Sequence, residues 1–343
     1  MAIIAVQLYD EIKMQTKKLI ISLIIILFIS GCGFGSEEGP IRVKDAYRGT
    51  DGLIMNFLEN VPAGDVFEDS SFRIYVELMN EGAFDISGGY LTLGLEEDYM
   101  SVDGDWSNLE PSRIDVLDEN HVMFYLDGKS PQSPLGEEDV ITIMVNALKF
   151  KEEQSEIHAS NIFMTACYDY QTTAGPSVCI DTDIHGSLSI EKPCRVRDIS
   201  LTSQGAPLAV TKVEVKMLPE DIRIKPHFLI YIENKGNGEV VRKDRVEQTC
   251  YSGSLDYSDI NVAEVTAFLS DKQLDCEPKI DNTDLKSTVK LKGKEAIVRC
   301  FTKDEDAIGK EKGTYTAPLK IIVNYGYTFT ISKGVTIRKV LTY

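Results

Sequence analysis

Paired acidic residues are the first candidates for chemistry in this chain of 343 residues. Asp103 and Asp105 are separated by one residue, Gly104, and loops of this kind supply some of the several oxygen ligands that calcium requires. Asn108 and Ile114 occupy the positions where an EF-hand loop has its glycine and its final glutamate. We therefore interpret the acidic clusters as solvated loops and keep Asp103 and Asp105 as weak calcium candidates. We expect no other metal site and no cofactor.

Six cysteines follow Cys32, and an even number in an exported chain is typical of disulfides. Cys167 and Cys179 flank a predicted hairpin centred near Thr173. Such a hairpin would place the two cysteines opposite each other, within bonding distance. The first predicted disulfide is therefore Cys167–Cys179.

The remaining four cysteines give two further predicted bonds. Cys276 can join a loop to the strand that ends at Cys300, and Cys194 then pairs with Cys250 by elimination. Zinc usually needs closely spaced pairs of ligands. The chain has no Cys-x-x-Cys, and the smallest spacing between a histidine and a cysteine is six residues, so disulfides are favoured over zinc.

The histidines indicate no catalytic centre. His121, His158, His185 and His227 are isolated, and strand alternation directs His227 toward solvent. The chain has no nucleophile elbow, zinc-protease helix, P-loop or dinucleotide fingerprint. Catalysis by a pair of carboxylates, as in glycosidases, remains an alternative, because the distance between two carboxylates depends on the three-dimensional fold. We expect no enzyme, and a carbohydrate-active enzyme with paired carboxylates is the third hypothesis.

The N-terminus has the pattern of an export signal. Lys17 and Lys18 precede an apolar run, Leu19–Ile29, which is followed by small residues. The stretch Ile29-Ser30-Gly31-Cys32 resembles a lipobox, the lipoprotein signal in which cleavage precedes the cysteine. That resemblance implies lipid attachment at Cys32. An uncleaved anchor helix is the alternative, and both place the rest of the chain outside the cytoplasm.

Alternating apolar residues predict that the rest of the chain is all-β. Apolar and polar residues alternate from Phe72 to Leu78, as in a half-buried strand. No long segment has the 3.6-residue period of a helix. Further strands are expected at about 53–58, 89–95, 121–126, 139–147, 161–170 and 177–183. Short strands separated by Gly- and Pro-rich turns favour a sandwich.

Two patterns repeat along the chain. Asn80-Glu81-Gly82 and Asn234-Lys235-Gly236 each end an alternating strand, at an offset of 154 residues. Tyr168-Asp169-Tyr170 and Tyr325-Gly326-Tyr327 recur at an offset of 157. We interpret these matches as a tandem duplication, with coincidence between generic strands and turns as the alternative. The tyrosine pairs are expected in the core, with a sugar-stacking platform as the alternative.

An alternating strand that ends in Asn-x-Gly resembles an immunoglobulin-like repeat of the CARDB type, which is common in prokaryotic envelope proteins. The whole layout resembles β-rich envelope lipoproteins of archaea. The resemblance implies two immunoglobulin-like β-sandwich domains in tandem. Each repeat is near 150 residues, against about 100 for a minimal immunoglobulin domain, so extra loops or strands are expected.

These observations divide the chain into four predicted parts. Residues 1–32 are a signal peptide or membrane anchor, 33–40 a flexible tether, 41–190 an acidic first sandwich and 191–343 a second sandwich. Residues 33–190 contain 30 acidic and 8 basic residues, a net charge of −22, so this part accounts for the whole of the chain's net charge of −18. This acidity excludes a sequence-independent DNA binder, which needs clustered Lys and Arg.

The predicted function is that of a membrane-anchored, extracytoplasmic envelope protein without enzymatic activity. It would serve as a binding, adhesion or structural module. The expected partners are the membrane, through an N-terminal lipid or helix, and a protein or polysaccharide, with no nucleic acid. A subunit of a secretion or pilus-like surface assembly is the alternative.

Overall fold

The computed structural model describes residues 47–62, 64–109, 113–150, 155–186, 191–252, 255–279 and 286–340. The predicted signal segment, the tether and Cys32 lie outside these residues. The chain divides into units 1–41 and 42–343, and all the described residues belong to the second unit.

The described chain is almost entirely β-strand, as predicted, and contains one short α-helix. The elements of the first half are β1 (Leu53–Phe57), β2 (Asp65–Phe67), β3 (Ser70–Asn80), β4 (Ile86–Gly94), β5 (Met100–Asn108), β6 (Ile114–Val116), β7 (His121–Leu126), β8 (Glu138–Ala147), β9 (Ile157–Ala174) and β10 (Ser177–Ile180). Those of the second half are β11 (Ile199–Ser200), β12 (Leu208–Glu220), β13 (Arg223–Asn234), β14 (Glu239–Val241), η2 (Lys243–Arg245), α2 (Val246–Ser252), β15 (Val262–Leu269), β16 (Lys272–Gln273), β17 (Asp275–Glu277), β18 (Ser287–Lys290), β19 (Glu295–Phe301), η3 (Asp304–Asp306), β20 (Ile308–Gly309), η4 (Lys310–Lys312) and β21 (Tyr315–Arg338).

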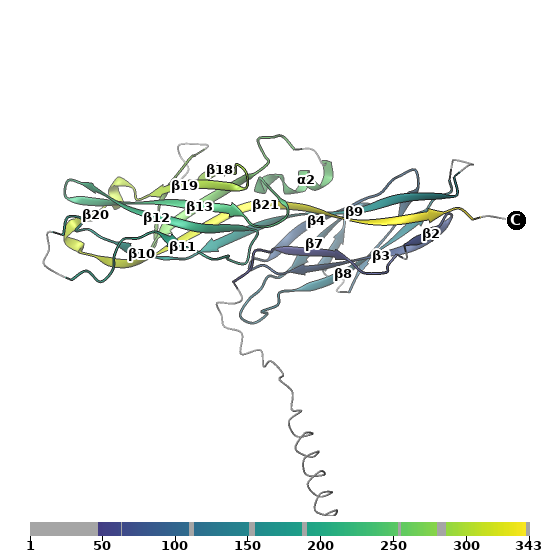
Figure 1. Cartoon of the computed structure of the whole chain (residues 1–343), viewed down its shortest axis with the longest axis horizontal. Coiled ribbons are helices and arrows are strands. Elements are labelled where there is room, and N and C mark those ends of the chain that lie inside the picture. Colours follow the sequence, from purple (N-terminus) through teal and green to yellow (C-terminus); the bar gives the residue numbers. More distant parts are fainter. Residues whose placement is uncertain are drawn as a thin grey trace, which may run out of the picture. The chain divides into compact units, whose positions relative to one another are not determined.

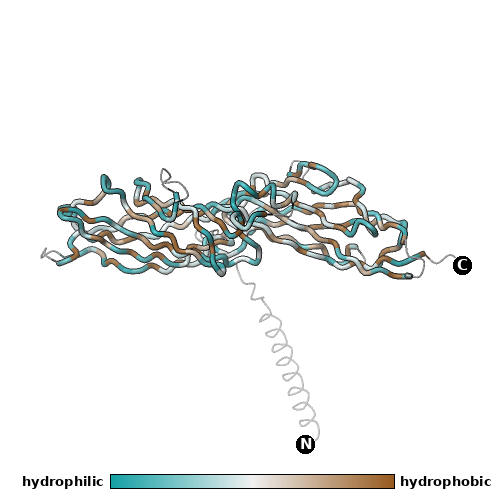
Figure 2. The backbone as a smooth tube through the Cα atoms, turned by 90° about the horizontal axis from the view of Figure 1, so that it is seen from above, coloured by the Kyte–Doolittle hydropathy of each residue, from teal (hydrophilic) through white to brown (hydrophobic). Residues whose placement is uncertain are grey.

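Alternation of buried residues explains why these segments are strands. In β3 the buried apolar residues are Ile74, Val76 and Leu78, and the residues between them are partly exposed. Ile74 lies opposite Ile143 of β8, so apolar pairs face each other across the sheet. Figure 2 shows this alternation of hydrophobic and hydrophilic residues along most strands. Each fully buried side chain of this size contributes about 1.5–3 kcal/mol of transfer free energy.

The strands form two β-sandwiches that share one large sheet. The first sandwich places the sheet β1-β3-β8-β5 over the part of the large sheet that contains β9, β4, β7 and β6. The second sandwich places β11-β12-β13-β19-β17 over the part that contains β16, β15 and β21. Most buried apolar residues of both sandwiches belong to one continuous hydrophobic cluster.

Strands β9 and β21 join the two sandwiches. They pair along all 18 residues of β9, from Ile157 opposite Arg338 to Ala174 opposite Ile321. Residues 163–167, in the middle of β9, also pair with β4 of the first sandwich, whereas β10, which continues β9, pairs with the start of β21 in the second. Strand β21 begins in the second sandwich, and its C-terminal end lies in the first, where it pairs with β2. Each sandwich is therefore completed by a strand from the other half of the chain (Figure 1).

This exchange bears on the predicted boundary at residues 190 and 191. Strands from both sides of that position lie next to each other in the large sheet, so the sheets do not separate there. The two sandwiches are still arranged in tandem, because most strands of each come from one half of the sequence.

The three disulfides are Cys167–Cys250, Cys179–Cys194 and Cys276–Cys300. The prediction of Cys276–Cys300 is confirmed, because these residues lie opposite each other on β17 and β19. These three bonds use all six cysteines of the described chain.

The other two predicted disulfides, Cys167–Cys179 and Cys194–Cys250, are wrong. The chain does not fold back near Thr173, because β9 runs through that residue and β10 continues along the same partner strand, β21. Twelve residues of strand separate the two cysteines by about 40 Å. Bonded cysteines have Cα atoms within about 7 Å of each other.

The described helices are short. The α-helix has seven residues, and no helix in the described part of the chain is long and apolar enough to cross a membrane.

Candidate functional site

Four tyrosines meet where β9 and β21 pass from one sandwich to the other. Tyr168 lies opposite Tyr327, and Tyr170 lies opposite Tyr325. All four are buried, and neighbouring rings pack edge-on or tilted, with centroids 5.5 to 6.4 Å apart. Their predicted place in the core is confirmed. The sugar-stacking alternative is wrong because no ring presents a free face.

Two of the hydroxyls bind the asparagine turns. Tyr170 donates to Oδ1 of Asn80 at 3.1 Å, and Tyr327 donates to Oδ1 of Asn234 at 3.3 Å. Each asparagine also closes its own turn, because Oδ1 accepts the backbone N–H two residues later and Nδ2 donates to backbone carbonyls. The two repeated motifs, Asn-x-Gly and Tyr-x-Tyr, are therefore two halves of one hydrogen-bonded unit that occurs twice.

The other two hydroxyls bind the backbone at the starts of β1 and β12. Tyr168 accepts the backbone N–H of Leu53, and Tyr325 accepts that of Leu208, both at 3.2 Å. Leu53 and Leu208 are equivalent, because each lies opposite the asparagine of its own sandwich. The junction thus has an approximate two-fold symmetry in its hydrogen bonds.

Both turns require a glycine because a tyrosine hydroxyl lies directly against it. A Cβ atom at Gly82 would overlap the hydroxyl of Tyr170, and one at Gly236 would overlap that of Tyr327. Any larger residue would require the tyrosine ring or the turn to shift. This contact explains why Asn-x-Gly recurs together with Tyr-x-Tyr.

Burial suppresses acid–base chemistry at this junction. It raises the pKa of Tyr327 to about 12 and raises the pKa of Tyr168, Tyr170 and Tyr325 above the ordinary value of 10. Their hydroxyls stay protonated at neutral pH and serve as structural hydrogen-bond groups.

A groove lies beside the junction in the first sandwich, and we call it the β1–β21 groove. It consists of two adjoining hollows of about 570 and 650 Å³ that share Met55 and Ile331. Its walls are β1, the turn before β14 and the segment of β21 near Phe329. Three carboxylates line it, Asp51, Glu59 and Glu239.

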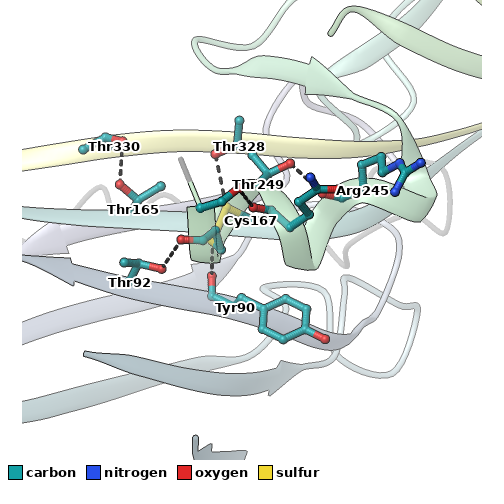
Figure 3. The surroundings of a disulfide bond; sticks show 11 residues. Tyr90, Thr92, Thr165, Cys167, Arg245, Thr249, Thr328 and Thr330 are labelled. Carbon is teal, nitrogen blue, oxygen red and sulfur yellow. Dashed lines mark hydrogen bonds between the residues drawn. A yellow bond between two sulfur atoms is a disulfide. The ribbon is translucent and has the colours of Figure 1, made fainter. Parts of the chain in front are cut away.

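Helix α2 fastens the second half of the chain to the first sandwich (Figure 3). The disulfide Cys167–Cys250 joins β9 to α2. The hydroxyl of Thr92 on β4 donates to the carbonyl of Cys250 at 3.0 Å. Tyr251 stacks on His121 of β7 with ring centroids 4.3 Å apart. The helix is therefore a second connection between the halves, beside the paired strands.

The predicted calcium candidates lie far from this junction in sequence, at an irregular part of β5 where the pairing with β8 shifts register. Asp103 is exposed, and the side chain of Asp105 is outside the described residues. Within the described ranges, no three His, Cys, Asp or Glu residues are grouped so that they could hold a metal ion. Calcium binding at this position stays a prediction.

Two carboxylates have a raised pKa. Burial raises the pKa of Asp169, and burial together with Glu137 and Asp85 raises that of Asp127. Neither residue lines the β1–β21 groove. Asp169 lies on the strand face opposite the buried tyrosines, where Lys243 is 3.7 Å away.

His227 lies on the outer face of β13, as predicted, but is half-buried there. It stacks on Phe301 with centroids 5.2 Å apart. Burial, with Arg299 and Lys225 nearby, lowers the pKa of His227 to about 4.

The strand exchange was missed from the sequence, although a signal for it was present. Apolar residues occupy every second position from Ala317 to Ile331, and the alternation resumes at Val335 and Ile337. Strands usually have 3–10 residues. A run of this length indicates one strand that is buried in two places in succession.

No protein-family model and no curated protein matches the chain. Among solved structures, it is similar to a chain of a cohesin–dockerin complex from Clostridium thermocellum, with 15% identity over 35% of this chain and 84% of that one, at a TM-score of 0.26. A cohesin module of a family 33 glycoside hydrolase from Clostridium perfringens has 9% identity over 34% and 81%, at 0.23. The C-terminal domain of the Streptococcus pyogenes antigen I/II-family protein AspA has 8% identity over 84% and 100%, at 0.20.

Replacing Tyr170 by Phe tests the junction. The variant leaves the N–H of Phe84 and Oδ1 of Asn80 without a buried hydroxyl partner. We expect the free energy of unfolding to fall by about 1–3 kcal/mol. The control is Tyr125→Phe, whose hydroxyl binds Asp115 at the surface and should change stability by less than about 0.5 kcal/mol. Urea unfolding with intact disulfides measures both, and equal effects would contradict a structural role for the junction.

The lowered pKa of His227 predicts a pH effect on stability. An unfolded histidine titrates near 6.5, so between pH 6.5 and 4 the unfolded chain binds a proton that the folded chain does not. The contribution of His227 to stability is complete above pH 6.5 and is lost as the pH falls toward 4. In the variant His227→Gln, the free energy of unfolding should decrease less over this interval than in the native chain. The exposed His185→Gln is the control, and parallel curves for all three proteins would refute the assignment.

Proposed function

We propose that this protein is a membrane-anchored extracytoplasmic envelope protein and that its two sandwiches form a non-enzymatic binding or adhesion module. The observation that carries the proposal is the paired β9 and β21, which run through both sandwiches without a flexible joint. A body of this kind holds its surfaces in a fixed relation. Such preorganisation reduces the entropy lost on binding.

The disulfides support a location outside the cytoplasm. All six cysteines of the described chain are bonded, and disulfides persist in oxidising environments outside the cytoplasm. The lipobox-like stretch that ends at Cys32 supports the same placement, through a lipid or an anchor helix.

The junction supports a binding role over a catalytic one. The hydroxyls of the four tyrosines are committed to backbone and asparagine partners, and their raised pKa values keep them protonated. The partner we propose is a protein or a polysaccharide of the envelope. The acidity of residues 33–190 favours a partner surface that is basic or rich in hydroxyl groups.

Cell fractionation tests the anchoring. The native chain should sediment with membranes, and mass spectrometry should find lipid on Cys32, whereas Cys32→Ser should lose that lipid. The six later cysteines should not react with a maleimide until the protein is reduced. A soluble cytoplasmic pool with reactive thiols would overturn the proposal.

Binding is tested with the purified chain against envelope polysaccharides and purified surface proteins. We expect saturable binding that leaves the ligand chemically unchanged. Release of sugar from a polysaccharide would instead establish the carbohydrate-active enzyme.

A subunit of a larger surface assembly is the second candidate. The specific observation in its favour is that, among the described strands, β1 pairs only with β3, so one edge of β1 is open. Open strand edges can pair with another chain. Cross-linking in intact cells that gave a regular ladder of multiples of this chain would favour this candidate.

A further inference from the structure

The β1–β21 groove exposes residues that are buried at the equivalent place in the second sandwich. Phe329 and Ile331 face the core of the first sandwich, yet both are partly exposed. At the offset of 157 residues their equivalents on β9 are Thr172 and Ala174, whose side chains are only 0% and 2% exposed. Among the described residues, the core of the first sandwich is therefore less completely covered at this place than that of the second.

In the second sandwich, the segment that precedes β12 also packs on the core. Its strand β11 pairs with β12, with Ile199 opposite Val213. Val196 and Leu201 pack on the hydrophobic core. The disulfide Cys179–Cys194 holds the start of this segment to β10, in the opposite sheet. The segment thus extends from the edge of one sheet to the edge of the other.

The sequence repeats the start of this segment before β1. Residues 38–45 read Glu-Gly-Pro-Ile-Arg-Val-Lys-Asp, and residues 191–198 read Glu-Lys-Pro-Cys-Arg-Val-Arg-Asp. Five of the eight positions are identical, and a sixth exchanges Lys for Arg. The offset of 153 residues agrees with those of the asparagine and tyrosine motifs.

We propose that residues 42–46 of the same chain occupy the β1–β21 groove, where they pair with the open edge of β1 and cover Phe329 and Ile331. In the proposed arrangement Val43 takes the place of Val196, which packs on the core, and Lys44 takes the place of Arg197, which is exposed.

Charge complements the shape of the groove. Asp51, Glu59 and Glu239 line it, and the segment brings Arg42 and Lys44 to its rim. Lys333 also lines the groove, but its ammonium group already donates to the carbonyls of Leu58 and Val61.

The two segments differ in how they are held. At position 41 the first repeat has Ile where the second has Cys194, and Thr336 stands where the second has Cys179. The segment of the first sandwich is therefore held without a covalent bond.

A cysteine pair in the full-length chain tests the proposal. In the double variant Val43→Cys with Ile331→Cys, non-reducing peptide mapping should find a bond between these positions within one chain. The matched control, Lys44→Cys with Ile331→Cys, moves the first thiol to the solvent side and should give at least about fivefold less bond. A yield equal to the control overturns the proposal. A bond between two chains also overturns it, because the occupant would then be a second copy.

Hydrogen exchange provides a second test that leaves Ile331 intact. In the variant Val43→Asp, amides of residues 53–57 and 329–333 should exchange roughly tenfold faster than in the native chain, because the segment leaves the groove. The variant Lys44→Asp places the same residue on the solvent side and should leave these rates within about twofold. Unchanged exchange in Val43→Asp, with the protein folded, would contradict the proposal.

Discussion

The hydrogen-bonded pairing of β9 with β21 is the constraint on which the rest of the structure depends. Each strand is buried first in one sandwich and then in the other, so neither sandwich has a complete sheet without residues from the other half of the chain. The symmetric hydrogen bonds of the junction follow from this exchange, because equivalent residues of the two repeats are brought face to face. Helix α2 and the disulfide Cys167–Cys250 add a covalent connection across the same junction.

Polar groups make this junction specific as well as stable. A buried hydroxyl or amide without a partner costs about 1–3 kcal/mol, so a shifted register of β9 on β21 would leave several such groups unpaired. In the observed register the hydroxyls of Tyr170 and Tyr327 each bind an asparagine, and the turn glycines leave room for them. A fixed arrangement of this kind reduces the entropy lost on binding a partner, which is why the proposed function rests on the junction.

The all-β class, the core positions and the equivalence of the two repeats could be predicted from the sequence, because burial in a strand follows a period of two and the motifs recur at constant offsets. The partner of a strand is a long-range choice that local patterns do not encode. The hairpin expected near Thr173 shows this, since the alternation was correct but the chain continued straight, and the pairing of Cys167 with Cys250 depends on that course. The β1–β21 groove was unpredictable for the same reason, although the repeat around Arg42 and Arg195 marks its proposed cover.

Differential scanning calorimetry of the purified chain, with its disulfides intact, tests the central claim most directly. If β9 and β21 join the sandwiches into one body, both must unfold together, in a single transition whose calorimetric and van't Hoff enthalpies agree. Two resolved transitions, or a van't Hoff enthalpy near half the calorimetric value, would show that the sandwiches unfold independently and would contradict the account.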